Sequence, residues 1–454
     1  MSARVRRPSP RSSRRIPIAV WAAAGVSAAL LLAAAACTGV LSGADVFVLP
    51  EDDVRLPQLL FNAEEGLERG YFPELQRYLE ELPREELEKN PAQLALYGKM
   101  LLARGDYDRA WRLLERARDL EGKTSRRAEI EWALAQGAVF WNDFRSGHDY
   151  AQAAIHDGYG LVPGFVNFLA ALEDVDVYAG AAPGESHAVE FEMRDFELVR
   201  VPVKVNGSAS EGLVDTGAVY SIVGESFARQ AGVREIPNSK ASGRGLHGKD
   251  FPVTFGVVEH LQFGGFALRD VPVMLMPDDA LLFDTSRGQF SVPVVLGLHL
   301  LKEFTMQIDY RNRKIQWTRA DFRLPKQDPD QNLFVHRGRL FVRATINKTG
   351  YFPFLLDTGS EPTMMTSVGL TRAHLKSSNA LAPRKVYGMA KSKVEWERIG
   401  KIAIGVDGYG IRFRDLIVQK TDTAFEDGVV GTSFLKHFRV RMDFARMILR
   451  LEEP

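Results

Sequence analysis

Apolar residues between positions 56 and 173 recur at spacings of three and four, which is the repeat of an amphipathic helix. Turn residues interrupt this pattern three times, at Gly70, Gly105 and Asn142. Glycine and asparagine at such points are typical of tight connections between helices. The pattern therefore predicts a helical domain built of hairpins over residues 56–173. Its apolar positions include Leu59, Leu60, Ala63, Leu67, Leu75, Leu79, Leu94, Leu101, Leu102, Leu113, Leu114 and Ala117.

A longer repeat underlies these helices. The three turns are 35 and 37 residues apart (105 − 70 and 142 − 105), close to the period of tetratricopeptide repeats. The middle unit resembles that repeat best, with Gly98 in its first helix and Ala110 in its second, small residues that let two helices approach closely. The segment thus resembles a short tetratricopeptide-like array of about three hairpins, which implies a protein partner. A plain helical cap on the rest of the chain is the alternative.

The pattern changes after residue 187, where short runs of valine, isoleucine and phenylalanine alternate with turn residues. One run covers residues 201–205 and ends before Asn206, and another covers residues 341–346 and ends before Asn347. Between the two halves, residues 174–186 are rich in glycine, alanine and proline and indicate a linker. The second half of the chain is therefore predicted to be all-β.

The β-rich half contains a duplication centred on two Asp-Thr-Gly tripeptides. Asp215 and Asp357 begin the two copies, and their separation in the sequence (357 − 215) is that of one small lobe. Apolar residues lead into each aspartate and resume shortly after it. One such tripeptide occurs by chance in many proteins, whereas two copies in the same strand context indicate a shared function.

A second duplicated element follows each tripeptide and consists of apolar residues that end in glycine. Gly297 ends the first copy and Gly431 the second, and the copies align without a gap beyond these glycines. Asp309 and Asp443 follow their glycines at the same interval (309 − 297 and 443 − 431). The repeat therefore extends through two lobes of similar size.

These paired motifs resemble the retropepsin-like and pepsin-like aspartic peptidases over about residues 190 to 454. The resemblance implies a multidomain protein in which an all-β, double-lobed acid-protease-like barrel follows the α-helical hairpin-repeat domain. The two retropepsin-like lobes are expected at residues 187–320 and 330–454, and their fusion in one chain implies a monomer. The family commonly carries Arg-Asn or Arg-Asp after the glycine. Here Leu298-His299 and Thr432-Ser433 stand there, a departure that concerns the scaffold pairing of the lobes.

The resemblance implies a role for each residue of the duplicated tetrapeptide. Asp215 and Asp357 would form a catalytic pair that shares one proton, because neighbouring carboxylates do not both ionise easily. Each threonine would brace the opposite loop, and each glycine would let backbone amides approach the carboxylates. The Ser360 hydroxyl can donate to its own aspartate and Ala218 cannot, so Asp357 is expected to ionise more readily. The supporting residues are Thr216, Gly217, Ala218, Thr358, Gly359 and Ser360.

Two further turns are candidates for flaps that hold the substrate. Gly245-Leu246 in the first lobe and Tyr387-Gly388 in the second lie at nearly equal offsets from their aspartates (245 − 215 and 388 − 357). An extended peptide would lie beneath these flaps as an added strand.

The N-terminus carries six arginines between Met1 and Arg15, followed by an uncharged run from Ile16 to Ala36. This combination is typical of a secretory leader or a membrane anchor. Cys37, the one cysteine of the chain, ends the run and resembles the lipid-modified cysteine of a bacterial lipoprotein. Residues 1–37 are predicted to be such a leader, with an uncleaved anchor or a cleaved signal as alternatives, and residues 38–55 a linker. Each reading places the remainder in the cell envelope, outside the cytoplasm.

Composition narrows the range of functions further. The 454 residues are 45% hydrophobic and 26% charged with a formal net charge of +0, so nucleic acid is not an expected partner. The histidines show no metal-ligand spacing, and no cofactor or metal is expected. The predicted function is an aspartic endopeptidase that hydrolyses a peptide or protein substrate. The alternative is a catalytically idle scaffold that binds peptides through the same fold and partners through the helical repeats.

Overall fold

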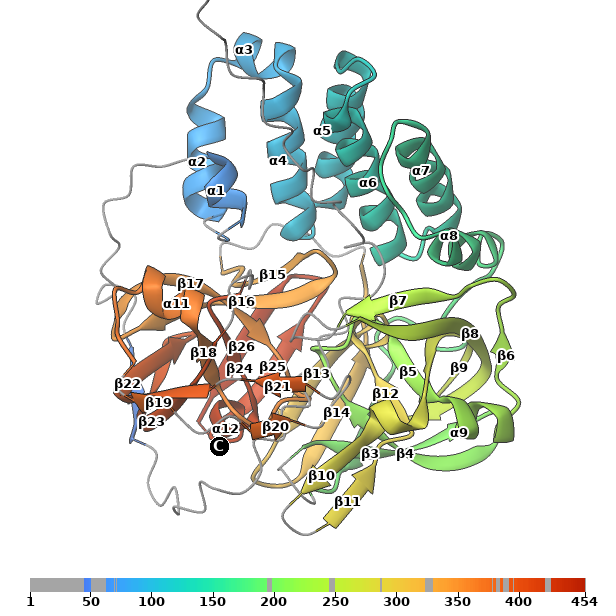
Figure 1. The fold of residues 1–454 in the computed structure, drawn as a ribbon, viewed down its shortest axis with the longest axis vertical. Coiled ribbons are helices and arrows are strands. Elements are labelled where there is room, and N and C mark those ends of the chain that lie inside the picture. Colours follow the sequence, from blue (N-terminus) through green and yellow to red (C-terminus); the bar gives the residue numbers. More distant parts are fainter. Residues whose placement is uncertain are drawn as a thin grey trace, which may run out of the picture.

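The computed structural model describes residues 45–49, 63–68, 70, 72–193, 198–244, 250–285, 288–322, 330–377, 379–380, 384–386, 392–394, 396–420 and 426–453. A layer of helices lies across one side of a two-lobed β structure (Figure 1). Among the helices within these ranges, none combines the length and apolar character needed to cross a bilayer. Cys37 and the apolar run before it lie outside the described residues.

The helical layer consists of antiparallel hairpins. The predicted turns at Gly105 and Asn142 separate α4 from α5 and α6 from α7, and both residues have positive φ, 79° and 66°. Glycine and asparagine tolerate this left-handed backbone better than other residues. The helices are α1 (Ala63–Glu68), α2 (Phe72–Glu81), α3 (Arg84–Lys89), α4 (Pro91–Ala103), α5 (Tyr107–Leu120), α6 (Ser125–Phe140), α7 (Phe144–His156) and α8 (Pro163–Ala170).

Small residues set the spacing inside the middle hairpin. A Cβ on Gly98 would lie 2.5 Å from the Leu114 Cγ and 3.2 Å from the Ala110 carbonyl oxygen. Both distances are shorter than ordinary van der Waals contact, so α4 and α5 approach too closely for any side chain at position 98. The close approach expected from Gly98 and Ala110 is therefore confirmed.

The first lobe closes into a six-stranded barrel. Its strands follow the order β3-β4-β12-β5-β9-β8, and β8 pairs back with β3. The short central strand β12 is buried throughout and lies between β4, to which it is parallel, and β5, to which it is antiparallel. The strands are β3 (Arg200–Val205), β4 (Ser208–Val214), β5 (Ser221–Gly224), β8 (Asp250–Phe263), β9 (Phe266–Met276) and β12 (Val294–Leu296).

The second lobe repeats this arrangement. Its six strands follow the order β23-β18-β24-β17-β16-β22, and β22 pairs back with β23. Strand β24 lies parallel to β17 and antiparallel to β18, as β12 does between its neighbours. The strands are β16 (Arg339–Ile346), β17 (Thr349–Leu356), β18 (Met364–Thr366), β22 (Trp396–Val406), β23 (Tyr409–Gln419) and β24 (Gly428–Val430).

One strand of the second lobe comes from far upstream. Residues Asp45–Val48 form β1, which pairs antiparallel with β23. These residues lie within the segment expected to be a linker, but alternation of valine and phenylalanine suits them to extend a sheet edge. Shorter elements decorate the two barrels: β6 (Arg234–Glu235), β7 (Ala241–Arg244), α9 (Glu225–Gln230), η3 (Asp278–Leu281), β10 (Leu282–Thr285), β11 (Gly288–Ser291), α10 (Leu298–Leu301), β15 (Leu333–His336), α11 (Ser367–Arg372), β19 (Asn379–Ala380), β20 (Arg384–Val386), β21 (Ser392–Val394) and α12 (Thr432–Leu435).

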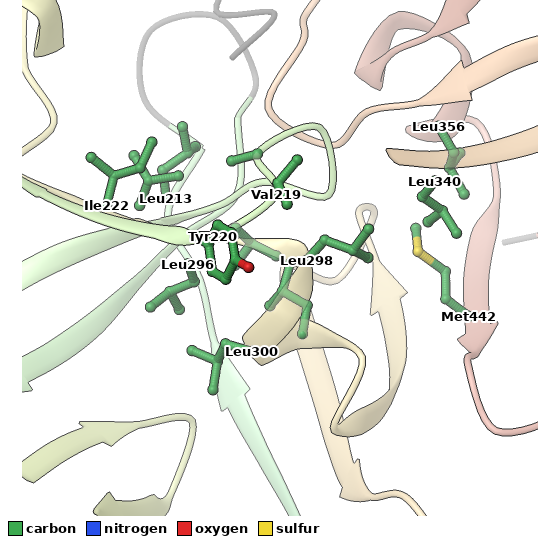
Figure 2. Packing of buried hydrophobic residues seen from close by; sticks show 14 of the residues in the cluster. Leu213, Val219, Tyr220, Ile222, Leu296, Leu298, Leu300, Leu340, Leu356 and Met442 are labelled. Atoms are coloured by element: carbon green, nitrogen blue, oxygen red, sulfur yellow. The ribbon is translucent and has the colours of Figure 1, made fainter. Parts of the chain in front are cut away.

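A shared sheet joins the lobes. Its five strands follow the order β2-β14-β13-β25-β26, so that β13 of the first lobe pairs directly with β25 of the second. The lobes therefore pair without the arginine that the family commonly carries. Buried apolar side chains from both lobes belong to one continuous core, part of which is seen in Figure 2. The strands are β2 (Ser186–Glu190), β13 (Phe304–Asp309), β14 (Lys314–Arg319), β25 (Arg439–Asp443) and β26 (Ile448–Glu452).

The helical layer packs on both lobes through aromatic residues. On the second lobe, Phe72 of α2 meets Phe334 of β15 edge-to-face, with ring centroids 4.6 Å apart. On the first lobe, Phe168 of α8 stacks on Phe255 of β8 at 4.2 Å. A Cβ on Gly164 of α8 would lie only 1.8 Å from the Lys240 carbonyl oxygen. The helices are thus fixed to the β structure by close contacts on either side.

Candidate active site

The two Asp-Thr-Gly loops begin at equivalent points of the two barrels. The Asp215 N–H donates to the Leu296 carbonyl at 3.0 Å, and the Asp357 N–H donates to the Val430 carbonyl at 3.1 Å. Each aspartate therefore leaves its strand at the point where the neighbouring apolar-apolar-Gly strand ends. The duplicated motifs of the sequence thus meet in pairs, one strand beside the other.

Steric crowding explains why each of these strands ends in glycine. A Cβ on Gly297 would lie 2.3 Å from the Tyr220 carbonyl oxygen, and one on Gly431 would lie 2.5 Å from that of Pro362. After each glycine, backbone N–H groups of α10 and α12 donate to the ends of the aspartate loops. Leu298 donates to Ala218 at 2.7 Å and Thr432 donates to Ser360 at 2.8 Å. The apolar-apolar-Gly element is therefore a support for the loop that carries the aspartate.

The threonines tie the two loops together. The Thr216 hydroxyl donates to the Leu356 carbonyl at 2.7 Å, and the Thr358 hydroxyl donates to the Val214 carbonyl at 2.8 Å. Each hydroxyl oxygen also accepts the N–H of the other threonine at 3.1 Å. Four buried hydrogen bonds with two-fold symmetry thus fix one lobe's loop against the other's.

The carboxyl groups of Asp215 and Asp357 converge between these loops. A Cβ on Gly217 would lie 2.4 Å from Asp357 Oδ2, and one on Gly359 would lie 2.3 Å from Asp215 Cγ. Only glycine therefore fits at either position. Both aspartates are fully buried, and within the described part of the chain the Oδ2 atom of each has no hydrogen-bond donor from another group.

Backbone amides hold the other oxygen of each carboxyl. Asp215 Oδ1 accepts the N–H groups of Gly217 at 2.8 Å and Ala218 at 3.1 Å. Asp357 Oδ1 accepts the N–H of Gly359 at 2.9 Å. Such donors favour the charged form of a carboxyl and partly offset the cost of its burial.

Burial nevertheless dominates the ionisation of the pair. It raises the pKa of Asp215 to about 6, while the hydrogen bond to Asp357 and the amides of Gly217 and Ala218 oppose the rise. Burial, and then the negative charge of Asp215, raise the pKa of Asp357 well above its ordinary value. Both carboxyls are therefore harder to ionise than a free aspartate, and their titration steps belong to the pair.

The Ser360 hydroxyl does not make the contact that the sequence suggested. The Ser360 hydroxyl donates to the Pro362 carbonyl at 3.1 Å and so does not act on Asp357. The expected hydrogen bond from this hydroxyl to the Asp357 carboxyl is therefore not formed, because the turn after Gly359 offers the hydroxyl a carbonyl.

The flap candidates lie outside the described residues, but the strands on either side of them are described. Strand β7 pairs with β8, with Arg244 opposite Asp250, and the residues between include Gly245 and Leu246. Strand β20 pairs with β21, with Val386 opposite Ser392, and the residues between include Tyr387 and Gly388. Each candidate thus connects the two strands of a hairpin.

Two residues of the first lobe, Tyr220 and His299, were not predicted as site residues from the sequence. Tyr220, close after Asp215 in the chain, packs edge-to-face on Phe168 of α8 with centroids 5.4 Å apart. His299 stacks on Tyr220 at 4.4 Å and is 4% exposed. Burial lowers the pKa of His299 well below its usual value, and the positive charge of Lys302 lowers it further. One feature of the sequence could have drawn attention to His299. After Gly297, Leu298-His299 stands where retropepsins commonly carry Arg-Asn or Arg-Asp.

A buried charged cluster extends from the same turn. Lys302 pairs with Glu303 and donates to the Asn142 Oδ1 at 3.0 Å, and the Glu303 Oε1 accepts from Asn142 Nδ2 at 2.8 Å. Arg319 pairs with Glu303 at 3.0 Å. Asn142 is the turn residue between α6 and α7, so this cluster joins the helical layer to the first lobe through polar contacts.

Comparison with known proteins finds a family similarity within the first lobe. Residues 201–300, which include Asp215, match the family model described as aspartyl protease. The solved structure of a retropepsin-like aspartic protease from Rickettsia conorii matches 31% of this chain and 95% of its own, at 14% identity and a TM-score of 0.21. No curated protein matches the chain. The family model thus matches part of the first lobe, and the second lobe repeats the closed six-stranded barrel of the first.

Proposed function

We propose that this protein is an aspartic endopeptidase whose dyad is formed by Asp215 and Asp357. The observation that carries the proposal is the symmetric set of hydrogen bonds between Thr216 and Thr358 with the opposite loops. These bonds hold two buried carboxyls together at a fixed geometry. A pair that shares one proton near neutral pH supplies both a base and an acid, which amide hydrolysis requires.

In the proposed reaction, ionised Asp215 takes a proton from a water molecule as its oxygen attacks the scissile carbonyl carbon. Protonated Asp357 donates to the carbonyl oxygen, which becomes a hydroxyl of the tetrahedral intermediate. Collapse of the intermediate returns that proton to Asp357 and breaks the C–N bond. The proton now on Asp215 passes to the leaving nitrogen, and the dyad regains its starting state.

A catalytically idle peptide-binding scaffold is the rival function. It would not need two ionisable side chains at the centre, whereas here both carboxyls and both supporting loops are present. Burying two carboxyls together is costly, and a binding surface gains nothing from that cost. The intact pair therefore favours the enzyme.

The proposal is tested with the full-length protein purified in detergent and a diverse peptide library. Cleavage products should appear, a statine-type inhibitor should suppress them, and Asp215→Asn and Asp357→Asn should each abolish them while keeping a normal melting transition. Activity per mole should also stay constant on dilution, because both lobes lie in one chain. Cleavage that persists in either folded variant would contradict the proposal that both aspartates form one catalytic pair.

We also propose that the protein acts in the cell envelope, attached to the membrane through a lipid on Cys37. The basic N-terminus and its apolar run support this placement. Its substrates would then be peptides or proteins outside the cytoplasm.

A further inference from the structure

A cavity of about 410 Å³ opens between the helical layer and the two lobes. Its volume lies within the range of about 300–1,000 Å³ that is usual for sites that bind small groups. Helices α4 and α6 form one wall, Val219, Tyr220 and His299 of the first lobe form another, and the β15–β16 turn of the second lobe closes it. No single domain of the chain builds this cavity alone.

The cavity is continuous with the loop that carries Asp215. Val219 lines it, and the preceding residue, Ala218, donates its N–H to Asp215 Oδ1 at 3.1 Å. Consecutive Cα atoms are about 3.8 Å apart, so Val219 lies within about 10 Å of the carboxyl. An extended peptide advances about 3.3–3.6 Å per residue. An extended substrate at the dyad would therefore span the distance to the cavity wall at Val219 in about two to four residues.

The walls of the cavity suit a flat apolar group. On the helical side, Trp132 and Tyr159 stack with centroids 5.6 Å apart. On the side of the first lobe, Tyr220 and His299 stack at 4.4 Å. Aromatic rings favour stacked or edge-to-face partners, and such contacts add to the gain from burying the ring.

Charge and hydrogen bonding refine this choice of occupant. Lys99 and Glu129 line the cavity and pair with each other at 3.8 Å, so this pair contributes little net charge, and Arg337 of the β15–β16 turn adds a positive group to the lining. Inside, the nearly buried His299 has an Nδ1 atom that receives no partner from the described residues. A buried polar atom without a partner is costly, and a ligand with a hydroxyl or N–H group can satisfy it.

We propose that this cavity is a specificity pocket for an aromatic side chain with a polar edge, tyrosine or tryptophan, of a peptide bound across the dyad. The helical layer would then be a wall of the substrate site. This inference rests on the proposed function, because it requires a peptide to lie between the two lobes.

The test measures binding, so that it reads the pocket even if no peptide bond is cut. Full-length Asp215→Asn protein in detergent is incubated with a random octapeptide library, and bound peptides are sequenced. Tyrosine and tryptophan should be enriched at one position. A peptide with tyrosine there should bind at least about tenfold more tightly than its alanine counterpart, and phenylalanine should fall between the two.

Matched variants in the same background locate the effect. Gln136 lines the cavity and Gln152 is exposed on α7. Gln136→Phe should fill the pocket and reduce the preference for tyrosine over alanine to about twofold or less, whereas Gln152→Phe should leave it unchanged. Ala133→Phe, on the same wall, replaces Gln136→Phe if that variant loses its melting transition.

The outcomes separate the inference from the proposed function. Absence of aromatic enrichment, absence of any bound peptide, or an unchanged tyrosine preference in the pocket-filling variant would overturn the pocket. Failure of the wild-type protein to cleave any library member would instead contradict the proposed peptidase function. The binding data would still test the cavity in that case.

Discussion

Thr216 and Thr358 exchange hydrogen bonds across the boundary between the lobes, the N–H of each donating to the hydroxyl oxygen of the other at 3.1 Å. This exchange makes the position of one aspartate loop depend on the other. Neither loop can shift without leaving buried backbone groups unpaired, which is costly. The geometry of the carboxyls is therefore a property of the whole two-lobed structure.

Thr216→Val should lower the free energy of unfolding by about 2–4 kcal/mol, because two buried hydrogen bonds are lost and their backbone partners stay unsatisfied. We expect kcat/KM to fall by about 100-fold or more as the loops lose their alignment. Urea denaturation and peptide hydrolysis measure the two effects. Thr216→Ser keeps the hydroxyl and should retain most of both. Equal losses in the valine and serine variants would show that the hydroxyl has no such role.

Asp215→Asn should stabilise the fold at neutral pH and much less in acid. The folded-state pKa of Asp215, about 6, is above the ordinary value of 3.8. Its contribution to the free energy of unfolding is therefore favourable in acid, where the carboxyl is protonated, and is lost as pH rises through 6. The cost at neutral pH is on the order of 3 kcal/mol. Urea denaturation at about pH 4 and about pH 7.5 measures it. Asp149→Asn, on the exposed side of α7, controls for the loss of a surface charge. A gain that is equal at both pH values would contradict the buried-charge explanation.

Catalysis should fall on the acid side as the dyad takes up its second proton. Because the pKa of Asp215 is raised to about 6, kcat/KM is expected to rise with pH through this region, which reports ionisation of the free enzyme. Ala218→Ser should leave the profile in place, since the equivalent hydroxyl of Ser360 donates to a carbonyl further along its own turn. A displaced profile in this variant would show that the new hydroxyl reaches the carboxylate.

Lys302→Met should lower the free energy of unfolding by about 3 kcal/mol or more. The buried carboxylate of Glu303 would lose one of the two positive charges that offset the cost of its burial. Arg319 still pairs with Glu303 at 3.0 Å and limits the loss. The double variant Lys302→Met/Glu303→Gln should recover part of it, since no buried carboxylate then remains. Thermal melts of the single and double variants measure the difference. Additive losses would argue against direct coupling of the pair.

Cys37→Ser should release the protein from membranes or block its maturation, because a lipid would have no point of attachment. Fractionation of cells together with the mass of the mature chain measures both outcomes. A variant that stays in the membrane fraction at the mass of the unchanged protein would favour the uncleaved anchor.

The sequence predicts the centre of this molecule better than its periphery. Asp215 and Asp357 could be paired because both copies of the motif keep the same order of strand, loop and glycine, and that order dictates which strands lie side by side. The hairpins could be predicted because Gly98 and Gly105 are needed by local sterics. Local patterns of this kind are repeated along the chain, so they can be read without the fold.

Contacts between distant segments could not be read in this way. The departure after Gly297 marks His299 as unusual, but it does not indicate that His299 stacks on Tyr220 under a helical layer, since that contact depends on where α8 docks. The hydroxyl of Ser360 was misassigned because its partner, the Pro362 carbonyl, depends on a turn rather than on composition. The sequence predicts a linker where β1 lies, because so short a segment cannot show a period.

The helical layer also breaks the two-fold symmetry of the site. Val219, Tyr220 and His299 line the cavity beneath it, whereas their counterparts in the second lobe, Glu361, Pro362 and Ser433, do not. A groove made by two identical subunits accepts a peptide equally well from N- to C-terminus or in reverse. A groove walled at one end accepts a peptide in only one orientation. The substrate residues that specify cleavage would then all lie on one side of the scissile bond.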